Sequence, residues 1–239
     1  MLTHATLTRQ GGRTYNEDHL NIVENGAGSL FLLADGLGGH GRGREASDAI
    51  VGKACEVYLA GPRAVLDECF QKSQDFLMAE QIRLNAQNEM KSTFVILWIS
   101  GGMAYSGHIG DSRLYHFRKN RLQFRSLDHS VPQMLVASGE IKEKDIRGHE
   151  DRNRLLRVMG MEWNTPKYEL HPSVKTAPGD SFLLCSDGLW EWIDEKMMIK
   201  TLKAAKTPAQ WLENMERTIL ANGEGHNMDN YSAIAVWIR

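Results

Sequence analysis

Six short apolar runs, rich in β-branched and aromatic residues, limit the folds open to this chain more than any other feature of its sequence. Each run predicts a strand. The runs are Leu30–Leu33, Phe94–Ile99, Ala104–Ile109, Arg113–Phe117, Phe182–Cys185 and Ala233–Ile238. Helical segments fall after the first run and before the last, and they do not alternate regularly with the strands. This order favours a layered α+β fold of mainly antiparallel strands over a parallel sheet.

The helical segments are predicted by apolar residues that recur every three or four positions. Such a stripe runs from Ala46 to Tyr58, and a second long helix is expected over Ala64–Leu84. Near the end of the chain, Thr207 is a suitable N-cap and Pro208 suits the first helical position. Asn222-Gly223 supplies the stop signal for this last helix.

The size and composition of the chain predict one domain over residues 1–239. The chain has 239 residues, 42% of them hydrophobic, and no Pro/Gly/Ser-rich linker divides it. Its formal net charge of -2 gives no broad attraction to nucleic acid or to an anionic membrane. The first residues lack an apolar signal segment, and the three cysteines have no close CxxC spacing. We therefore expect a cytoplasmic monomer with reduced thiols.

Two of the apolar runs end in nearly the same sequence, Ala-Asp35-Gly-Leu and Ser-Asp187-Gly-Leu. A single Asp-Gly is most simply a turn signal. Here, however, further acids occupy similar places at the ends of runs or in the first loop: Asp111, Asp229, Glu17 and Asp18. Repetition of the pattern suggests that several strands deliver carboxylates to one edge of the fold.

Carboxylates beside an apolar core need a compensating charge, and few basic residues lie near these acids in the sequence. Bound cations would supply it. No cysteine pair or HExxH motif accompanies the acids, so the oxygen-rich set favours magnesium or manganese over zinc. Two such ions lower the pKa of a bridging water and stabilise the charge of phosphoryl displacement. Arg13 fits as a bidentate clamp for the phosphate oxygens.

Six motifs in this order resemble the metal-dependent protein phosphatase family, type 2C. They are Arg13-x-x-Asn16-Glu17-Asp18, Asp35-Gly36-x-Gly38-Gly39-His40, Gly110-Asp111-Ser112-Arg113, Asp128-His129-Ser130, Ser186-Asp187-Gly188 and Asp229-Asn230. The resemblance spans essentially the whole chain. It implies a four-layer α-β-β-α sandwich, two mainly antiparallel sheets flanked by helices. It also implies that the protein hydrolyses phosphoserine and phosphothreonine on other proteins with Mn²⁺ or Mg²⁺.

The resemblance further implies a role for each acidic position. Asp35 matches the carboxylate that bridges two ions, and Asp187 and Asp229 match ligands of one of them. Asp111 matches the position that, with Asp187, can hold a weaker third ion.

On the other ion, the resemblance places the carbonyl of Gly36 with Glu17 or Asp18, partly through water. Arg13 matches the phosphate-binding arginine, and Asn230 matches a residue that supports the ligands from behind. Residues 133–157 correspond to a variable flap beside the cleft, where peptide selectivity is expected.

Some positions depart from the family pattern. Lys91-Ser92-Thr93 and Tyr231-Ser232 replace other residues at the entries to two strands. His40 follows Asp35 by five residues, whereas animal members place a general-acid histidine two residues after the aspartate. The identity of the leaving-group acid therefore stays open. The residues in these motifs resemble those of stand-alone bacterial members of the family. This resemblance implies phosphoprotein substrates, a cognate Hanks-type kinase and, in some members, an association with type VI secretion.

Two other functions are compatible with parts of the sequence. Gly36–Gly41 also satisfies the dinucleotide-binding pattern G-x-G-x-x-G, but the acid expected about 20 residues later is Glu56, which falls inside a helical stripe. A non-enzymatic phosphoprotein-binding relative would keep Arg13 and lose the ions. Retention of all the acidic positions disfavours it, because unneeded buried carboxylates destabilise a fold.

Four further expectations concern residues other than the acids. Trp190 and Trp192 are predicted to pack in the core and not to stack on substrate. His129 is expected to help cap a helix that begins near Ser130. The nine histidines show no metal-ligand spacing. For the flap arginines two interpretations stay open, a solvated face or an attraction for phosphopeptide: Arg152, Arg154 and Arg157.

Overall fold

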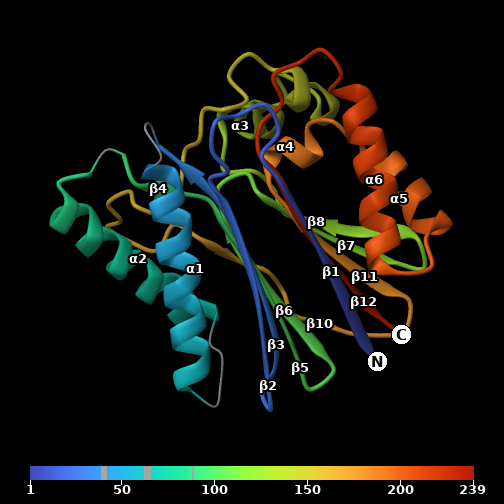
Figure 1. The fold of residues 1–239 in the computed structure, drawn as a ribbon, viewed down its shortest axis with the longest axis horizontal. Coiled ribbons are helices and arrows are strands. Elements are labelled where there is room, and N and C mark those ends of the chain that lie inside the picture. The colour runs from blue at the N-terminus through green and yellow to red at the C-terminus, as the bar shows by residue number, and fades with distance from the viewer. Residues whose placement is uncertain (39–41, 62–65, 88) are drawn as a thin grey trace.

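A computed structural model of the chain describes residues 1–38, 42–61, 66–87 and 89–239. Two sheets lie face to face, and helices cover the outer face of each (Figure 1). Every strand pairing in the described residues is antiparallel. The predicted α+β fold with two antiparallel sheets and flanking helices is therefore confirmed.

The two sheets are formed by strands far apart in the sequence. The first has the order β1 (Leu2–Arg9), β12 (Tyr231–Ile238), β11 (Asp180–Cys185), β7 (Arg113–Arg118) and β8 (Arg121–Arg125). The second has the order β10 (Val174–Lys175), β6 (Met103–Ile109), β5 (Phe94–Ser100), β3 (Gly28–Leu37) and β2 (Asp18–Asn25). Two short strands extend it, β4 (Lys91–Ser92) beside β3 and β9 (Glu169–Leu170) beside β6.

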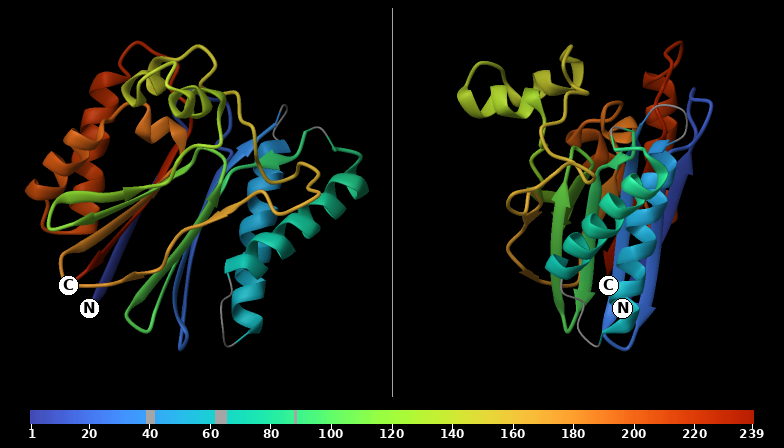
Figure 2. Two further views of the ribbon diagram at one scale, coloured as in Figure 1. Left: turned by 180° about the vertical axis from the view of Figure 1, so that it is seen from behind. Right: turned by 90° about the vertical axis from the view of Figure 1, so that its left-hand side faces the viewer.

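The helices form two outer layers and one projecting segment, which the two views of Figure 2 separate clearly. Helices α1 (Arg42–Ala60) and α2 (Leu66–Leu84) cover the second sheet. Helices α4 (Asp187–Trp190), α5 (Glu195–Ala204) and α6 (Pro208–Asn222) cover the first. The connection from β8 to β9 holds α3 (Val131–Ser138) and the 3-10 helix η2 (Glu143–Gly148). Ala64, the predicted start of the second helix, lies outside the described residues.

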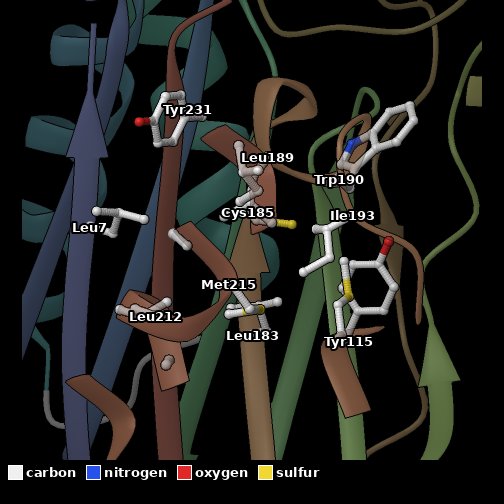
Figure 3. Packing of buried hydrophobic residues seen from close by; sticks show 14 of the residues in the cluster. Leu7, Tyr115, Leu183, Cys185, Leu189, Trp190, Ile193, Leu212, Met215 and Tyr231 are labelled. Carbon is white, nitrogen blue, oxygen red and sulfur yellow. The ribbon is translucent and has the colours of Figure 1, made fainter. Parts of the chain in front are cut away.

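Three apolar cores separate the four layers, and the two-residue period of the strands assigns side chains to them. In β3, Leu30, Leu32 and Ala34 face the helices α1 and α2, whereas Phe31 and Leu33 face the other sheet. Strands β11 and β12 divide their side chains in the same way between the helix-facing core and the core between the sheets. Figure 3 shows part of the core beneath α4, α5 and α6.

Strand period and register also direct Asp35 into the space between the sheets. Asp35 lies two residues after Leu33 in β3, so it shares the face that points at the other sheet. Asp18, the first residue of β2, is its register partner. Two acids on adjacent strands thus meet at one end of the core between the sheets.

The glycine pattern that resembled a dinucleotide fingerprint has a different cause in this fold. Strand β3 runs antiparallel to both β2 and β5, so it is not part of a parallel βαβ unit. A Cβ atom on Gly36 would lie 2.1 Å from the Gly43 carbonyl oxygen, so the glycine permits β3 and α1 to meet. Gly39, His40 and Gly41 lie outside the described residues. The dinucleotide interpretation is therefore wrong.

Two further observations bear on the expectations from composition. No helix in the described part of the chain is long and apolar enough to cross a membrane. The cysteines Cys55, Cys69 and Cys185 are all free thiols, the last two of them buried.

Candidate active site

A cavity of about 510 Å³ opens at the end of the sandwich where the acidic strand ends converge. Its lining includes eight of the nine site residues predicted from the sequence: Arg13, Glu17, Asp35, Gly36, Asp111, Asp187, Asp229 and Asn230. The ninth, Asp18, is buried behind them, and its Oδ2 accepts a hydrogen bond of 2.8 Å from Ser186 Oγ. The structure therefore brings the whole predicted set together.

Four different elements deliver the aspartates. Asp35 lies near the end of β3, and Asp187 is the first residue of α4, directly after β11. Asp111 lies in the turn between β6 and β7, and Asp229 lies two residues before the start of β12. Because these strands belong to both sheets, the site depends on how the two sheets are packed.

Hydrogen bonds of the Asn230 side chain attach the N-terminal loop to this cluster. Its Oδ1 accepts a hydrogen bond of 2.9 Å from the Glu17 backbone N–H, and its Nδ2 donates to the carbonyls of Gln10 at 2.6 Å and Tyr15 at 2.9 Å. Asn230 is 5% exposed, and each hydrogen-bond partner of its side chain is a backbone group. Asn230 thus holds the loop of Arg13 and Glu17 in place.

The carboxyl groups are strongly perturbed because they are removed from water and crowd one another. Burial, followed by the charges of neighbouring aspartates, raises the pKa of Asp35 and of Asp187 well above the usual range. Burial and then the charge of Asp128 raise the pKa of Asp111 to about 7. For Asp18, burial raises the pKa to about 6. A cluster of this kind is stabilised by cations that allow all its members to ionise.

Unpartnered oxygen atoms show that the donor set fits hard metal ions. Glu17 Oε1, Asp18 Oδ1 and Asp187 Oδ1 are buried and have no hydrogen-bond partner in the described structure. Such atoms are costly unless something binds them. The surrounding donors are carboxylate and carbonyl oxygens, the ligands that magnesium and manganese prefer.

Arg13 contributes the one basic side chain among the described residues that line the cavity. It is about half exposed, and its Nη2 lies 2.6 Å from Asp229 Oδ2. The guanidinium therefore contacts one of the predicted ligands directly. A phosphate group in the cavity would meet Arg13 and the acidic cluster at the same time.

The flap also reaches the cavity, through residues that the sequence did not single out. Asn153 and Leu155 line it, as do Thr14 and Tyr15 beside Arg13. Thr14 and Tyr15 occupy the two unspecified positions of the motif Arg13-x-x-Asn16. Their place next to Arg13 in the sequence is the signal from which they could have been predicted. For Asn153 and Leu155 the local sequence carries no comparable signal.

The flap arginines have two different environments. Arg152 Nε donates to Glu191 Oε1 at 2.8 Å, just after α4, and the Glu191 side chain is only 13% exposed. Arg154 pairs with Asp151 within the flap and is 69% exposed. Arg152 therefore anchors the flap near Asp187, which neither open interpretation had foreseen, whereas Arg154 fits the solvated face.

His129 does not cap the helix that follows it, so that expectation is wrong. Ser130 is the N-cap of α3, and its hydroxyl accepts from the Gln133 N–H. The His129 imidazole instead accepts a hydrogen bond of 3.2 Å from the Gly110 N–H through Nδ1.

The histidines also cluster in a way that their spacing did not reveal. One ligand atom each from His108, His129 and Glu169 lies within 4.8 Å of the others. The rings of His108 and His129 stack at an angle of 16°, so their in-plane lone pairs run nearly parallel and do not converge on one ion.

The prediction for the tryptophans is confirmed for Trp190, which is 1% exposed within the core of the first sheet. Trp192 is partly buried and packs against the same core.

Comparison with known proteins places this site in a family. A family model described as Protein phosphatase 2C matches residues 9–230 of the chain. This chain belongs to the protein phosphatase 2C family. Membership confirms the enzyme class predicted from the sequence, a metal-dependent protein serine/threonine phosphatase whose cofactor is Mn²⁺ or Mg²⁺.

Individual members of the family are similar over most of their length. The serine/threonine phosphatase stp of Listeria welshimeri is 30% identical over 215 residues, covering 85% of this chain and 84% of that protein. The catalytic domain of the phosphatase PstP, crystallised with two manganese ions, has a TM-score of 0.83 at 25% identity and covers 99% of this chain and 97% of its own. PppA, a regulatory component of the type VI secretion system in Pseudomonas aeruginosa, has a TM-score of 0.78 at 29% identity, with coverage of 99% and 97%.

Proposed function

We propose that this protein phosphatase 2C family member removes phosphate from phosphoserine and phosphothreonine of proteins with two cations held by the acidic cluster. The observation that carries the proposal is the convergence of buried, unpartnered carboxylate oxygens with one arginine in a single cavity. Bound manganese or magnesium supplies a Lewis acid that activates water and offsets the charge of the transferred phosphoryl group. The similarity to the serine/threonine phosphatases stp and PstP supports the substrate class.

Within this proposal each acid keeps the role that the resemblance implied. Asp35 bridges the two cations, which fits its place at the centre of the carboxyl groups that raise its pKa. Asp187 and Asp229 hold one cation. The carbonyl of Gly36 with Glu17 or Asp18, partly through water, would serve the other, and Asp111 with Asp187 would form the weaker third site. Asp18 is buried and does not line the cavity, so it acts from behind it.

Arg13 binds the phosphate oxygens of the substrate. Its half-exposed guanidinium has free donors beyond the bond to Asp229, and a planar guanidinium matches the geometry of a phosphate. Arg13→Ala should therefore raise KM while manganese binding changes little. Because Arg13 also contacts Asp229, calorimetry of manganese binding is the measurement that separates the two contributions.

Residues 1–239 form one catalytic domain in this proposal, with residues 133–157 as a flap that contributes to peptide selectivity. The family match over 9–230 and the flap residues Asn153 and Leu155 at the cavity support this division. The protein acts in the cytoplasm, for which the free cysteines are the support, and it acts as a monomer. Its substrates are a cognate Hanks-type kinase and the targets of that kinase. The similarity to PppA favours a role in type VI secretion.

Activity measurements after metal removal test the proposal. Hydrolysis of p-nitrophenyl phosphate and of a phosphothreonine peptide should require added manganese or magnesium, stop with EDTA and return when the metal is restored. Undiminished turnover by thoroughly chelated protein would overturn the metal mechanism. Binding of a phosphopeptide without turnover at any metal concentration would instead support the non-enzymatic alternative.

A further inference from the structure

The turn that carries Asp111 is held by hydrogen bonds from outside its own two strands. His129 Nδ1 accepts from the Gly110 N–H at 3.2 Å, and the His129 N–H donates to the Gly110 carbonyl at 2.9 Å. On the other side, Trp190 Nε1–H donates to the Asp111 carbonyl at 2.9 Å. Gly110 has a φ of +99°, and a Cβ there would lie 2.6 Å from the Thr93 side chain. The turn therefore has one tightly defined conformation.

The bond from Trp190 joins two carboxylate-bearing segments directly. Helix α4 begins with Asp187 and ends with Trp190, so its single turn spans from one aspartate to the carbonyl of the other. Both aspartates line the same cavity, so their carboxylates repel each other when they are ionised. Without the hydrogen bond from Trp190, this repulsion favours a wider separation of the two segments.

Contacts with other residues hold both the ring and the backbone of Trp190 in place. The guanidinium of Arg113 lies 3.5 Å from the centre of the indole ring, and it donates to both oxygens of Asp128 at 2.7 and 2.6 Å. Arg147 Nε donates to the Trp190 carbonyl at 2.9 Å. Figure 3 shows the ring at one end of the labelled core residues, above Ile193. An indole held in this way presents its N–H in a fixed direction.

We propose that Trp190 is a positioning residue that sets the spacing between Asp111 and Asp187 and thereby the affinity of the weaker cation site they form. This inference rests on the proposed function, in which these two carboxylates share an ion. Trp190 touches neither substrate nor cation, and it acts only through the Asp111 turn. His129 supports the same turn through its two hydrogen bonds with Gly110.

The test compares two conservative substitutions of buried tryptophans. Trp190→Phe keeps an aromatic ring under Arg113 and removes the N–H donor. Trp211→Phe is the matched control, because Trp211 is 0% exposed and donates from Nε1 to the Met198 carbonyl at 3.1 Å, within the same core and outside the cavity lining. The measurements are p-nitrophenyl phosphate hydrolysis against manganese concentration, and calorimetric titration with manganese.

Trp190→Phe should raise the manganese concentration for half-maximal activity by about tenfold. Loss of a residue that orients metal ligands typically lowers metal affinity or activity by about 10- to 100-fold, and the expected shift is at the lower end of that range. Activity should recover at saturating manganese, the tight binding events should stay unchanged, and Trp211→Phe should match the parent. In an Asp111→Asn background, adding Trp190→Phe should cause no further shift, because the residue acts through Asp111. Equal curves for the two tryptophan variants, or a shift that persists in the Asp111→Asn background, would overturn the inference.

A second pair of variants keeps the test decisive if Trp190→Phe does not fold. His129→Ala removes the acceptor for the Gly110 N–H, whereas His129→Asn can supply one from its amide oxygen. The alanine variant should show the manganese shift and the asparagine variant should not, and the reverse order would overturn the role of the turn. A parent protein without manganese-dependent turnover would overturn the proposed function itself, which is a different outcome from unshifted curves.

Discussion

Asp35 illustrates how a single residue connects the fold to the chemistry. Strand period directs it between the sheets, and burial together with its aspartate neighbours raises its pKa well above the usual range. Its backbone is fixed as well, because the Asp35 N–H donates to Thr93 Oγ1 at 3.0 Å and the Asp35 carbonyl accepts from the Thr93 N–H at 2.9 Å. The charged side chain is therefore electrostatically unfavourable without cations, and its backbone is held in the position where we propose that it binds them.

Asp35→Asn should abolish most of the activity while leaving the fold intact. The change keeps the size of the side chain and one oxygen but removes the charge that offsets two cations. Loss of an outer residue that orients ligands costs about 10- to 100-fold in activity or affinity, so loss of the bridge should cost at least as much. In EDTA the variant should melt at the same temperature as the parent or higher, because repulsion among the carboxylates is relieved. Kinetics at saturating manganese and a melting curve in EDTA are the measurements; a near-parental kcat would show that Asp35 is only a turn residue.

At the scale of elements, the strand ends were predictable and the loops between them were not. Asp35, Asp111, Asp187 and Asp229 each follow or precede a predicted apolar run, so the sequence indicates their positions at strand ends. Strands β1 and β2 were not predicted, and Asp18, which was expected in a loop, is the first residue of β2. The contacts of His129 and Trp190 with the Asp111 turn join segments that are distant in sequence, and no periodicity encodes them. The flap residues Asn153 and Leu155 lie in an irregular segment, where position in the sequence does not fix direction in space.

The flap is joined to the site through α4. Arg152 binds Glu191 one residue after the end of α4, and Arg147 in η2 binds the Trp190 carbonyl. Burial is the main cause that raises the pKa of Glu191, and the charge of Arg152 opposes it. The position of the flap and the position of Asp187 are therefore mechanically linked by a few polar contacts at one end of a short helix.

Arg152→Ala should impair hydrolysis of a phosphopeptide more than hydrolysis of p-nitrophenyl phosphate. Loss of a partly exposed ion pair is worth up to about 1 kcal/mol. That energy corresponds to a reduction of about fivefold in kcat/KM for the peptide. The small substrate needs no flap contact and should be affected by less than about twofold on the same scale. Arg154→Ala is the control, since Arg154 pairs within the flap at the exposed surface. Equal effects of the two substitutions on both substrates would contradict an anchoring role for Arg152.

For the whole molecule, the acidic cluster makes stability depend on metal and pH together. Raised pKa values of about 6 for Asp18 and about 7 for Asp111 mean that the metal-free fold favours their neutral forms. This contribution to stability is present at low pH and is lost as pH rises through these values. Buried histidines act in the opposite direction: burial, then the charge of His108, lowers the pKa of His129 and of His171 to about 3. Their contribution is present above the unfolded pKa and is lost as pH falls.

The difference in melting temperature between manganese-loaded and EDTA-treated protein should therefore increase as pH rises from 5.5 to 8. Histidine contributions are common to both forms and cancel in this difference, whereas cations compensate the aspartates only when these are ionised. Manganese at about 100 times its dissociation constant stabilises a protein by about 2.7 kcal/mol, which for a chain of this size is a shift of about 5 to 10 °C. Differential scanning fluorimetry across this pH range, with Asp35→Asn as the control that should lose most of the shift, measures it. A metal-induced shift that stays constant from pH 5.5 to 8 would show that the cluster is already ionised without cations, and the electrostatic account of why this site binds metal would be wrong.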